Sequence, residues 1–81
     1  MKYAIDFKPR ALKDLDSMDP KNVRQILGKV RLLQNDLFGD VKRSKNFDPK
    51  FRLRVGDDRV LFNVIGQTIQ VYRIIHRREA Y

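Results

Sequence analysis

The chain has 81 residues, of which 42% are hydrophobic and 35% charged; this predicts one small globular domain over residues 1–81 and excludes a disordered segment. Eighteen Lys and Arg residues against ten Asp and Glu give a net charge of +8, which favours nucleic acid or an acidic protein as partner. The absence of cysteine and the presence of a single histidine exclude a disulfide scaffold, a thiolate nucleophile and a zinc site built on Cys or several His residues, and we expect no metal or cofactor.

The first half of the chain is predicted to form a strand followed by two helices. Apolar and polar residues alternate over residues 2–7, which is typical of a half-buried strand. Apolar residues at helical spacing predict a helix over 9–18. Asp19 followed by Pro20 predicts the capped start of a second helix. Its apolar stripe runs to Leu37, so we expect this helix to end at 38–40.

The second half is predicted to form three strands, preceded by a polar and basic loop over 40–50. The strands are expected over 51–55, 59–65 and 68–75, and the tight turns between them are Gly56-Asp57 and Gly66-Gln67. The order β-α-α-β-β-β predicts an α+β fold in which the helical hairpin packs on one face of an antiparallel sheet. The opposite face of the sheet is then the candidate working surface.

Several basic residues fall where they can gather on this sheet. Residues 42–81 carry a net charge of +6, against +2 for residues 1–41. Arg52 and Arg54 are two apart on one strand and therefore share a face. Arg59 follows the Gly56-Asp57 turn, so it can lie near Arg54. The alternative for these arginines is an ordinary solvated face.

The last strand and the tail carry further candidates. Strict alternation over 68–75 places Arg73 on the same face as Ile69 and Val71. Arg73 could contact RNA. The alternative is an ion pair with an aspartate, for which the candidates are Asp6, Asp57 and Asp58. Arg77 and Arg78 follow this strand, with Tyr81 at the end of the chain. Up to five guanidinium groups and one phenol could therefore converge on one face and its edge.

A cluster of arginines fits cleavage of RNA better than other chemistries. Guanidinium groups bind phosphate oxygens in pairs and stay charged, so they suit a phosphorane that gains negative charge. The 2′-OH of RNA can be the nucleophile, so neither a metal nor a protein nucleophile is required. Three kinds of group stay open as general base and acid: Tyr81, His76 and an arginine.

The same residues carry a family resemblance. The stretch from Phe51 to Phe62, which reads FRLRVGDDRVLF, the tail HRREAY over 76–81 and the opening Tyr3-x-Ile5-x-Phe7 strand resemble the RelE/ParE superfamily of toxin–antitoxin toxins. The arginine-rich strand and the tail point to the RelE branch. The resemblance covers essentially the whole chain.

The resemblance implies a compact fold similar to microbial ribonucleases and a ribosome-dependent endoribonuclease that cuts mRNA in the ribosomal A site. The family's catalytic positions map onto Arg52, Arg54, Arg59, Arg77 and Tyr81, with Arg78 as the alternative to Arg77. The sequence departs from the family at two places. The paired strand positions, which are commonly lysines in the family, are Arg52 and Arg54 here. The position before Arg59, which is often aromatic in the family, is Asp58 here. We predict RNA contacts from Lys42, Arg43, Lys45, Lys50, Arg73 and Arg78.

The implied partners are a RelB-like antitoxin with an acidic, partly disordered segment, the ribosome with its 16S rRNA, and mRNA. No apolar run is long enough for a signal peptide or a membrane span, so we expect a cytoplasmic protein that does not bind a membrane. Two other functions stay open. ParE toxins share the fold and act on DNA gyrase, and a basic domain of this size can also bind RNA without cutting it.

Overall fold

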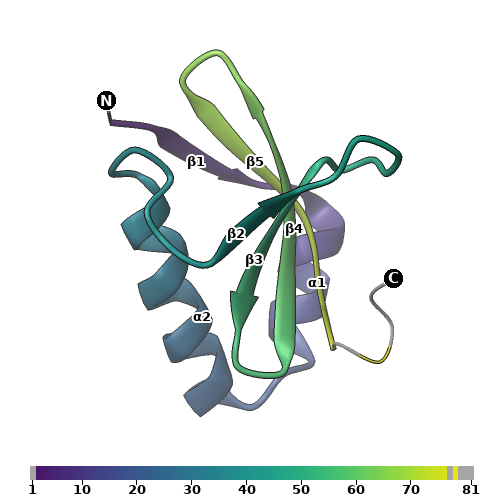
Figure 1. Cartoon of the computed structure of the whole chain (residues 1–81). Helices are drawn as coiled ribbons and strands as arrows, with labels where there is room; N and C mark the ends of the chain where they lie inside the picture. The colour runs from purple at the N-terminus through teal and green to yellow at the C-terminus, as the bar shows by residue number, and fades with distance from the viewer. Residues whose placement is uncertain (1, 77, 79–81) are drawn as a thin grey trace.

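The computed structural model describes residues 2–76 and 78, and these form two helices and one five-stranded sheet (Figure 1). In chain order the elements are β1 (Ala4–Phe7), α1 (Pro9–Asp16), α2 (Pro20–Leu33), β2 (Val41–Arg43), β3 (Phe51–Val55), β4 (Asp58–Ile65) and β5 (Thr68–His76). The sheet order is β1-β5-β4-β3-β2. β1 pairs with β5 in parallel, and the other neighbours are antiparallel. The predicted α+β fold class is confirmed.

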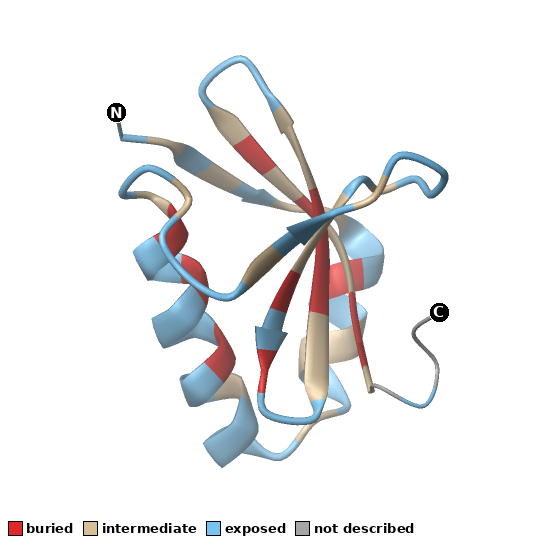
Figure 2. Ribbon diagram, viewed as in Figure 1, coloured by how far each residue is buried: buried red, intermediate tan, exposed pale blue. Residues whose placement is uncertain are grey.

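Both helices contribute to one core on one face of the sheet. Ala11 of α1 and Ile26 and Val30 of α2 are buried in the same cluster as the sheet residues Phe62 and Val71. Figure 2 shows the buried positions of α2 on the side that faces the strands. Burying these apolar side chains against the sheet stabilises the fold and leaves its other face uncovered by helices. Neither helix in the described part of the chain is long and apolar enough to cross a membrane.

The second helix starts where the sequence predicts and ends earlier. Asp19 caps it, since its carboxylate accepts a hydrogen bond of 2.9 Å from the backbone N–H of Lys21. The helix ends at Leu33 and does not reach Leu37. The backbone N–H of Tyr3 donates to the carbonyl oxygen of Gln34 at 3.0 Å. In a longer helix this carbonyl oxygen would instead accept a hydrogen bond from the next helical turn. Leu37 has a left-handed φ of 60°.

The segment over 40–50, predicted as a loop, contains the short strand β2. Its residues Val41, Lys42 and Arg43 pair with Leu53, Arg52 and Phe51. Only Val41 of the three is apolar, so the sequence shows almost none of the alternation of apolar and polar residues that predicts a strand. Charged residues on an edge strand are common because they prevent pairing with a further chain.

A β-bulge reverses the alternation expected along β5. The register pairs Phe62 with Val71 but Leu61 with Arg73, so Tyr72 is the extra residue. Beyond it, Ile74 joins the core cluster. Arg73 therefore leaves the core-facing row of β5, and the predicted placement of Arg73 with Ile69 and Val71 is wrong. An inserted residue shifts a period of two by one step.

Candidate functional site

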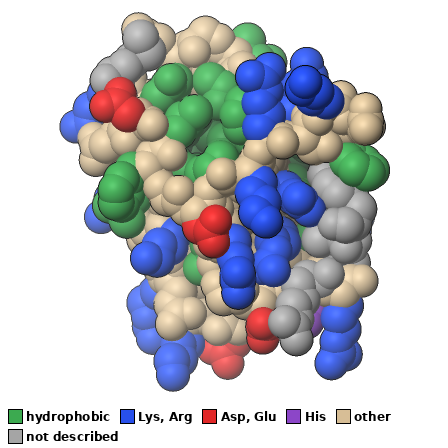
Figure 3. Space-filling view, viewed as in Figure 1, with side chains coloured by type: hydrophobic (Ala, Val, Ile, Leu, Met, Phe, Trp, Pro, Cys, Tyr) green, Lys and Arg blue, Asp and Glu red, His purple; other side chains and the backbone are tan. Residues whose placement is uncertain are grey.

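Four cationic residues form a staggered arrangement over three neighbouring strands, β2, β3 and β4, on the open face of the sheet. Arg52 and Arg54 alternate with the buried Leu53 and Val55 on β3, so both face away from the helices. Lys42 lies directly opposite Arg52 across the β2–β3 ladder. Figure 3 shows Lys and Arg side chains gathered at the centre of the view that carries β3 and β4.

The fourth cation is Arg59, which the β3–β4 turn places directly opposite Arg54. Gly56 takes a φ of 59° in this two-residue turn, a conformation that glycine adopts without a steric cost. Arg59 Nη1 donates to the carbonyl oxygens of Gly56 at 3.0 Å and Asp58 at 2.9 Å. These bonds fix the guanidinium over the turn and leave other N–H groups available to a ligand, since a guanidinium has five.

This arrangement opposes like charges in two adjacent rows. Lys42 faces Arg52, and Arg54 faces Arg59. Directly opposed like charges destabilise a sheet. Within residues 2–76 and 78, no carboxylate forms an ion pair with Lys42, Arg54 or Arg59. A ligand with closely spaced negative charges would relieve this repulsion.

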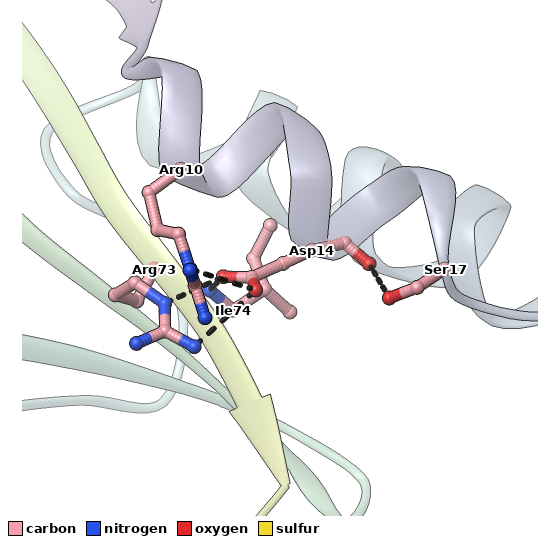
Figure 4. Close-up of polar contacts among 5 residues, drawn as sticks. All are labelled: Arg10, Asp14, Ser17, Arg73 and Ile74. Atoms are coloured by element: carbon pink, nitrogen blue, oxygen red, sulfur yellow. Dashed lines mark hydrogen bonds and ion pairs between the residues drawn. The ribbon is translucent and has the colours of Figure 1, made fainter.

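Arg73 lies at the edge of the sheet, where an acid holds it. Its Nε donates to Asp14 Oδ2 at 2.8 Å and its Nη2 to Asp14 Oδ1 at 3.3 Å (Figure 4). The backbone N–H of Ile74 donates to the same carboxylate at 2.9 Å. Asp14 thereby fastens α1 to β5 beyond the point where β1 has ended, and it orients Arg73 at the margin of the cationic face.

The contacts of Asp14 also change its pKa. Burial alone raises the pKa of this carboxyl. The hydrogen bonds from Arg73 and Ile74 and the positive charges of Arg73 and Arg10 outweigh burial and lower the pKa below its ordinary 3.8. Asp14 was not among the acids that the sequence suggested as partners for Arg73. The sequence did carry one signal for Asp14. It lies three residues after the buried Ala11, so it shares the helix face that packs on the sheet.

His76 lies away from the cationic arrangement. The register pairs it with Asp58, and it is two residues from the core residue Ile74. It therefore points to the helix-bearing side of the sheet, opposite to Arg54 and Arg59. Its Nδ1 accepts a hydrogen bond of 3.2 Å from the backbone N–H of Arg78. This geometry favours a structural role for His76 at the end of β5.

The other predicted contacts do not share one face of the sheet. Arg43 lies 5.7 Å over the ring of Phe51, and that ring stacks on Phe62 at 5.3 Å. Arg43 is therefore placed on the helix side of β2. Lys45 and Lys50 are exposed beside β2 and β3, and Arg78 is exposed after β5. The predicted catalytic residues Arg77 and Tyr81 lie outside the described residues.

Comparison with known proteins identifies the family. A family described as "ParE toxin of type II toxin-antitoxin system, parDE" matches residues 5–81. The chain is 32% identical over 84 residues to "Putative toxin RelE1" of Methanocaldococcus jannaschii, covering 98% of this chain and 93% of that protein. The chain belongs to the RelE/ParE superfamily. It is a RelE-like toxin of a type II toxin–antitoxin system.

Solved structures of the superfamily share the architecture of this toxin. A RelB–RelE antitoxin–toxin complex from Methanococcus jannaschii matches with a TM-score of 0.75 and 29% identity, covering 93% of each chain. The toxin–antitoxin complex RelBE2 from Mycobacterium tuberculosis matches with a TM-score of 0.81, covering 95% of this chain and 100% of that one. At 21% identity, the second match supports the fold alone.

Proposed function

We propose that this toxin is an endoribonuclease that cuts mRNA in the A site of the ribosome and so stops translation. The observation that carries the proposal is the pair of opposed cation rows, Lys42 with Arg52 and Arg54 with Arg59, on the open face of the sheet. A phosphodiester backbone supplies closely spaced negative charge that would match Lys42, Arg54 and Arg59, and arginine forks bind its oxygens in pairs.

The reaction needs no group from outside the RNA as nucleophile. The 2′-oxygen attacks the adjacent phosphorus, the bond from phosphorus to the 5′-oxygen breaks, and the products are a 2′,3′-cyclic phosphate and a 5′-hydroxyl. Arg54 and Arg59 would bind the non-bridging oxygens, whose charge increases in the phosphorane. Since Arg59 is already fixed by two backbone carbonyls, it loses little freedom on binding substrate.

Two proton transfers complete the reaction. A base takes the proton from the 2′-OH, and an acid gives a proton to the leaving 5′-oxygen. Tyr81 is our proposed base on the strength of the family resemblance, since positive charges placed around a phenol favour its ionised form. Arg77 is the proposed donor to the leaving group, with Arg78 as the alternative. Lys45, Lys50 and Lys42 would contact flanking phosphates and ribosomal RNA.

The proposed partner is an antitoxin of the RelB type with an acidic segment that covers the basic surface. The RelB–RelE structure described above, at 29% identity, is a complex of a toxin with its antitoxin. A protein with net charge +8 attracts such a segment through electrostatic complementarity.

A second candidate function follows from the family match, which names the ParE toxin. A ParE-like toxin would inhibit DNA gyrase without cutting RNA. In that case the cationic face would contact a protein, and its arginines would not need to bind a phosphodiester.

Mapping of message ends after brief expression in cells tests the two functions. We expect cut messages from the wild-type chain within minutes and none above background from Arg59→Ala. Arg31→Ala, which removes an exposed arginine from the last turn of α2, is the matched control and should cut normally. Intact messages with early DNA damage would contradict the proposal and favour gyrase. Purified toxin should cut message on ribosomes much faster than free RNA, since a chain this small orients substrate poorly by itself.

A further inference from the structure

A notch interrupts the sheet where β4 extends beyond the start of β3. β3 begins at Phe51, opposite Phe62, so the last residues of β4, numbers 63–65, pair only with β5 in the described part of the chain. Figure 1 shows the segment between β2 and β3 leaving the sheet at this point. The notch has a volume of about 380 Å³, and Arg43, Lys50 and Phe51 line it together with the end of β4.

One wall of the notch is the end of a stack of flat side chains. The buried ring of Phe62 stacks on the ring of Phe51, with 5.3 Å between the centroids and 17° between the planes. The Cζ atom of Arg43 lies over Phe51, 5.7 Å from the ring centroid. Arg43 is exposed, and within residues 2–76 and 78 no carboxylate forms an ion pair with it. Its guanidinium can therefore stack on a further planar group, such as a nucleobase.

Another wall of the notch is strand backbone that has no neighbouring strand on this side. A two-residue turn pairs Ile65 with Thr68. The alternation of an antiparallel ladder then directs the N–H and C=O groups of Val64 away from β5 and toward the notch. Pro49 precedes β3 nearby and has no N–H with which to extend the β3–β4 ladder. The notch therefore offers a backbone donor and a backbone acceptor, which suit the edge of an unpaired base.

Asn63 fixes the shape of the notch. Its Oδ1 accepts a hydrogen bond of 2.7 Å from the backbone N–H of Lys50, and its Nδ2 donates to Asp48 Oδ1 at 3.0 Å. These bonds join the segment before β3 to β4 and engage the one carboxylate among the described lining residues. Since an amide nitrogen has two N–H groups, Asn63 keeps one donor for a ligand. Arg43 and Lys50 give the notch a positive rim.

We propose that the notch binds an unpaired base of the substrate RNA, stacked on the guanidinium of Arg43 and hydrogen-bonded along its edge by Val64 and Asn63. The inference rests on the proposed nuclease function and adds a subsite to it. Asn63 lies four residues beyond Arg59 on β4, which is about 13 Å at the usual rise of a strand. The bound base therefore belongs to a nucleotide near the cut, and Lys50 would contact its phosphate.

The chemistry of the notch favours a base over a protein segment. An extended acidic peptide would pair with the free backbone of Val64 and satisfy the positive rim. It would leave the outer face of the Arg43 guanidinium without a planar partner. A nucleotide uses the guanidinium face, the backbone groups and the rim together.

Titration of the purified full-length toxin with AMP tests the notch without using RNA cleavage. Ribose 5-phosphate is the matched probe, because it keeps the sugar and the phosphate and lacks the base. In ¹⁵N spectra we expect AMP to shift the backbone amide of Val64, the side-chain amide of Asn63 and the Nε–H signal of Arg43 in a saturable manner. Ribose 5-phosphate should leave the Val64 and Asn63 signals in place.

Arg43→Lys separates stacking from charge, since lysine keeps the positive charge and lacks the planar group. We expect it to weaken AMP binding by at least about fivefold, the lower end of what one stacked base contributes. Lys45→Ala, which removes an exposed cation of the same segment outside the notch lining, should bind AMP like wild type. Because Arg43 is exposed, both variants should fold, and circular dichroism checks this.

Three results would overturn the inference. The first is equal shifts of the Val64 and Asn63 signals by AMP and by ribose 5-phosphate. The second is an AMP affinity that Arg43→Lys leaves within about twofold of wild type. The third is a peptide of alternating Glu and Leu that shifts these signals while AMP does not, which would assign the notch to a protein segment.

Cleavage of message on ribosomes is measured separately. A wild-type toxin that binds AMP in the notch but cuts no message would contradict the nuclease proposal alone. Normal cleavage by a wild-type toxin whose Val64 and Asn63 signals do not respond to AMP would contradict the notch alone.

Discussion

Arg54 and Arg59 lie directly opposite each other across the β3–β4 ladder, on the face of the sheet that carries no helix. The two-residue turn after Val55 fixes this register, and Gly56 supplies the positive φ that the turn requires. Directly opposed like charges destabilise a sheet. The proposed contact of Arg54 and Arg59 with an RNA phosphate would account for two arginines at these positions.

Replacing Arg59 should therefore separate stability from activity. We expect Arg59→Ala to lower the rate of message cleavage on ribosomes by about 10²-fold or more, because it removes a fixed donor to the phosphorane. The free energy of unfolding should stay within about 1 kcal/mol of wild type, since relief of repulsion offsets the lost backbone contacts. Urea unfolding and a cleavage time course measure the two quantities. A stable variant with wild-type cleavage would remove Arg59 from the catalytic set.

Tyr81→Phe tests the proposed base. The substitution deletes one hydroxyl, so we expect kcat on ribosomes to fall by about 10²-fold or more while KM changes little. If Tyr81 instead stacks on a base of the message, Tyr81→Phe would preserve activity and Tyr81→Ala would raise KM. The ratio of kcat to KM effects in the two variants distinguishes these roles.

His76→Ala should have only a small effect on the reaction. Its side chain lies on the helix-bearing side, and its Nδ1 accepts the backbone N–H of Arg78. We expect cleavage within about fivefold of wild type on ribosomes. A loss comparable to that of Arg59→Ala would make His76 a catalytic group.

Asp14→Asn should destabilise the protein in a pH-dependent manner. The folded state lowers the pKa of Asp14, so the carboxylate stabilises the fold above its unfolded pKa, and this contribution disappears as pH falls through the lowered value. We expect a loss of about 1–3 kcal/mol at pH 7, the typical cost of breaking hydrogen bonds between charged groups. The difference from wild type should shrink below about pH 4.

Urea unfolding of wild type and Asp14→Asn at a series of pH values gives that difference directly. Asp16→Asn serves as the control, because Asp16 is exposed on the same helix and should show no comparable loss. A pH-independent gap between wild type and Asp14→Asn would mean that the charge of Asp14 is not what holds Arg73 and β5.

Gly28→Ala should stabilise the free toxin by about 0.5–1 kcal/mol, because alanine restricts the unfolded chain and favours helix. The open space around the position means that the methyl group meets no steric obstacle. Thermal unfolding should show a higher Tm than wild type. An unchanged or lower Tm would indicate that Gly28 has a role in the monomer itself.

Local patterns of the sequence determined most of the fold. The Asp19 cap, the hairpin turns at Gly56 and Gly66 and the alternation of β3 depend on neighbours a few residues apart and lie where they were predicted. The two helices start where they were predicted but end earlier, at Asp16 and Leu33. The shared face of Arg52 and Arg54 follows from the same alternation. The tail residues Arg77 and Tyr81 stay predictions from family resemblance.

Only the tertiary structure decided the features that depend on partners distant in the chain. Tyr3 bonds to Gln34 at the end of α2, β2 pairs with β3, and the bulge at Tyr72 moves Arg73 out of the core-facing row to the edge of the sheet, where Asp14 of α1 holds it. Each of these contacts joins segments that local propensity treats as independent. A hydrogen-bond partner or a register shift from another element changes the direction of a side chain without changing the sequence around it.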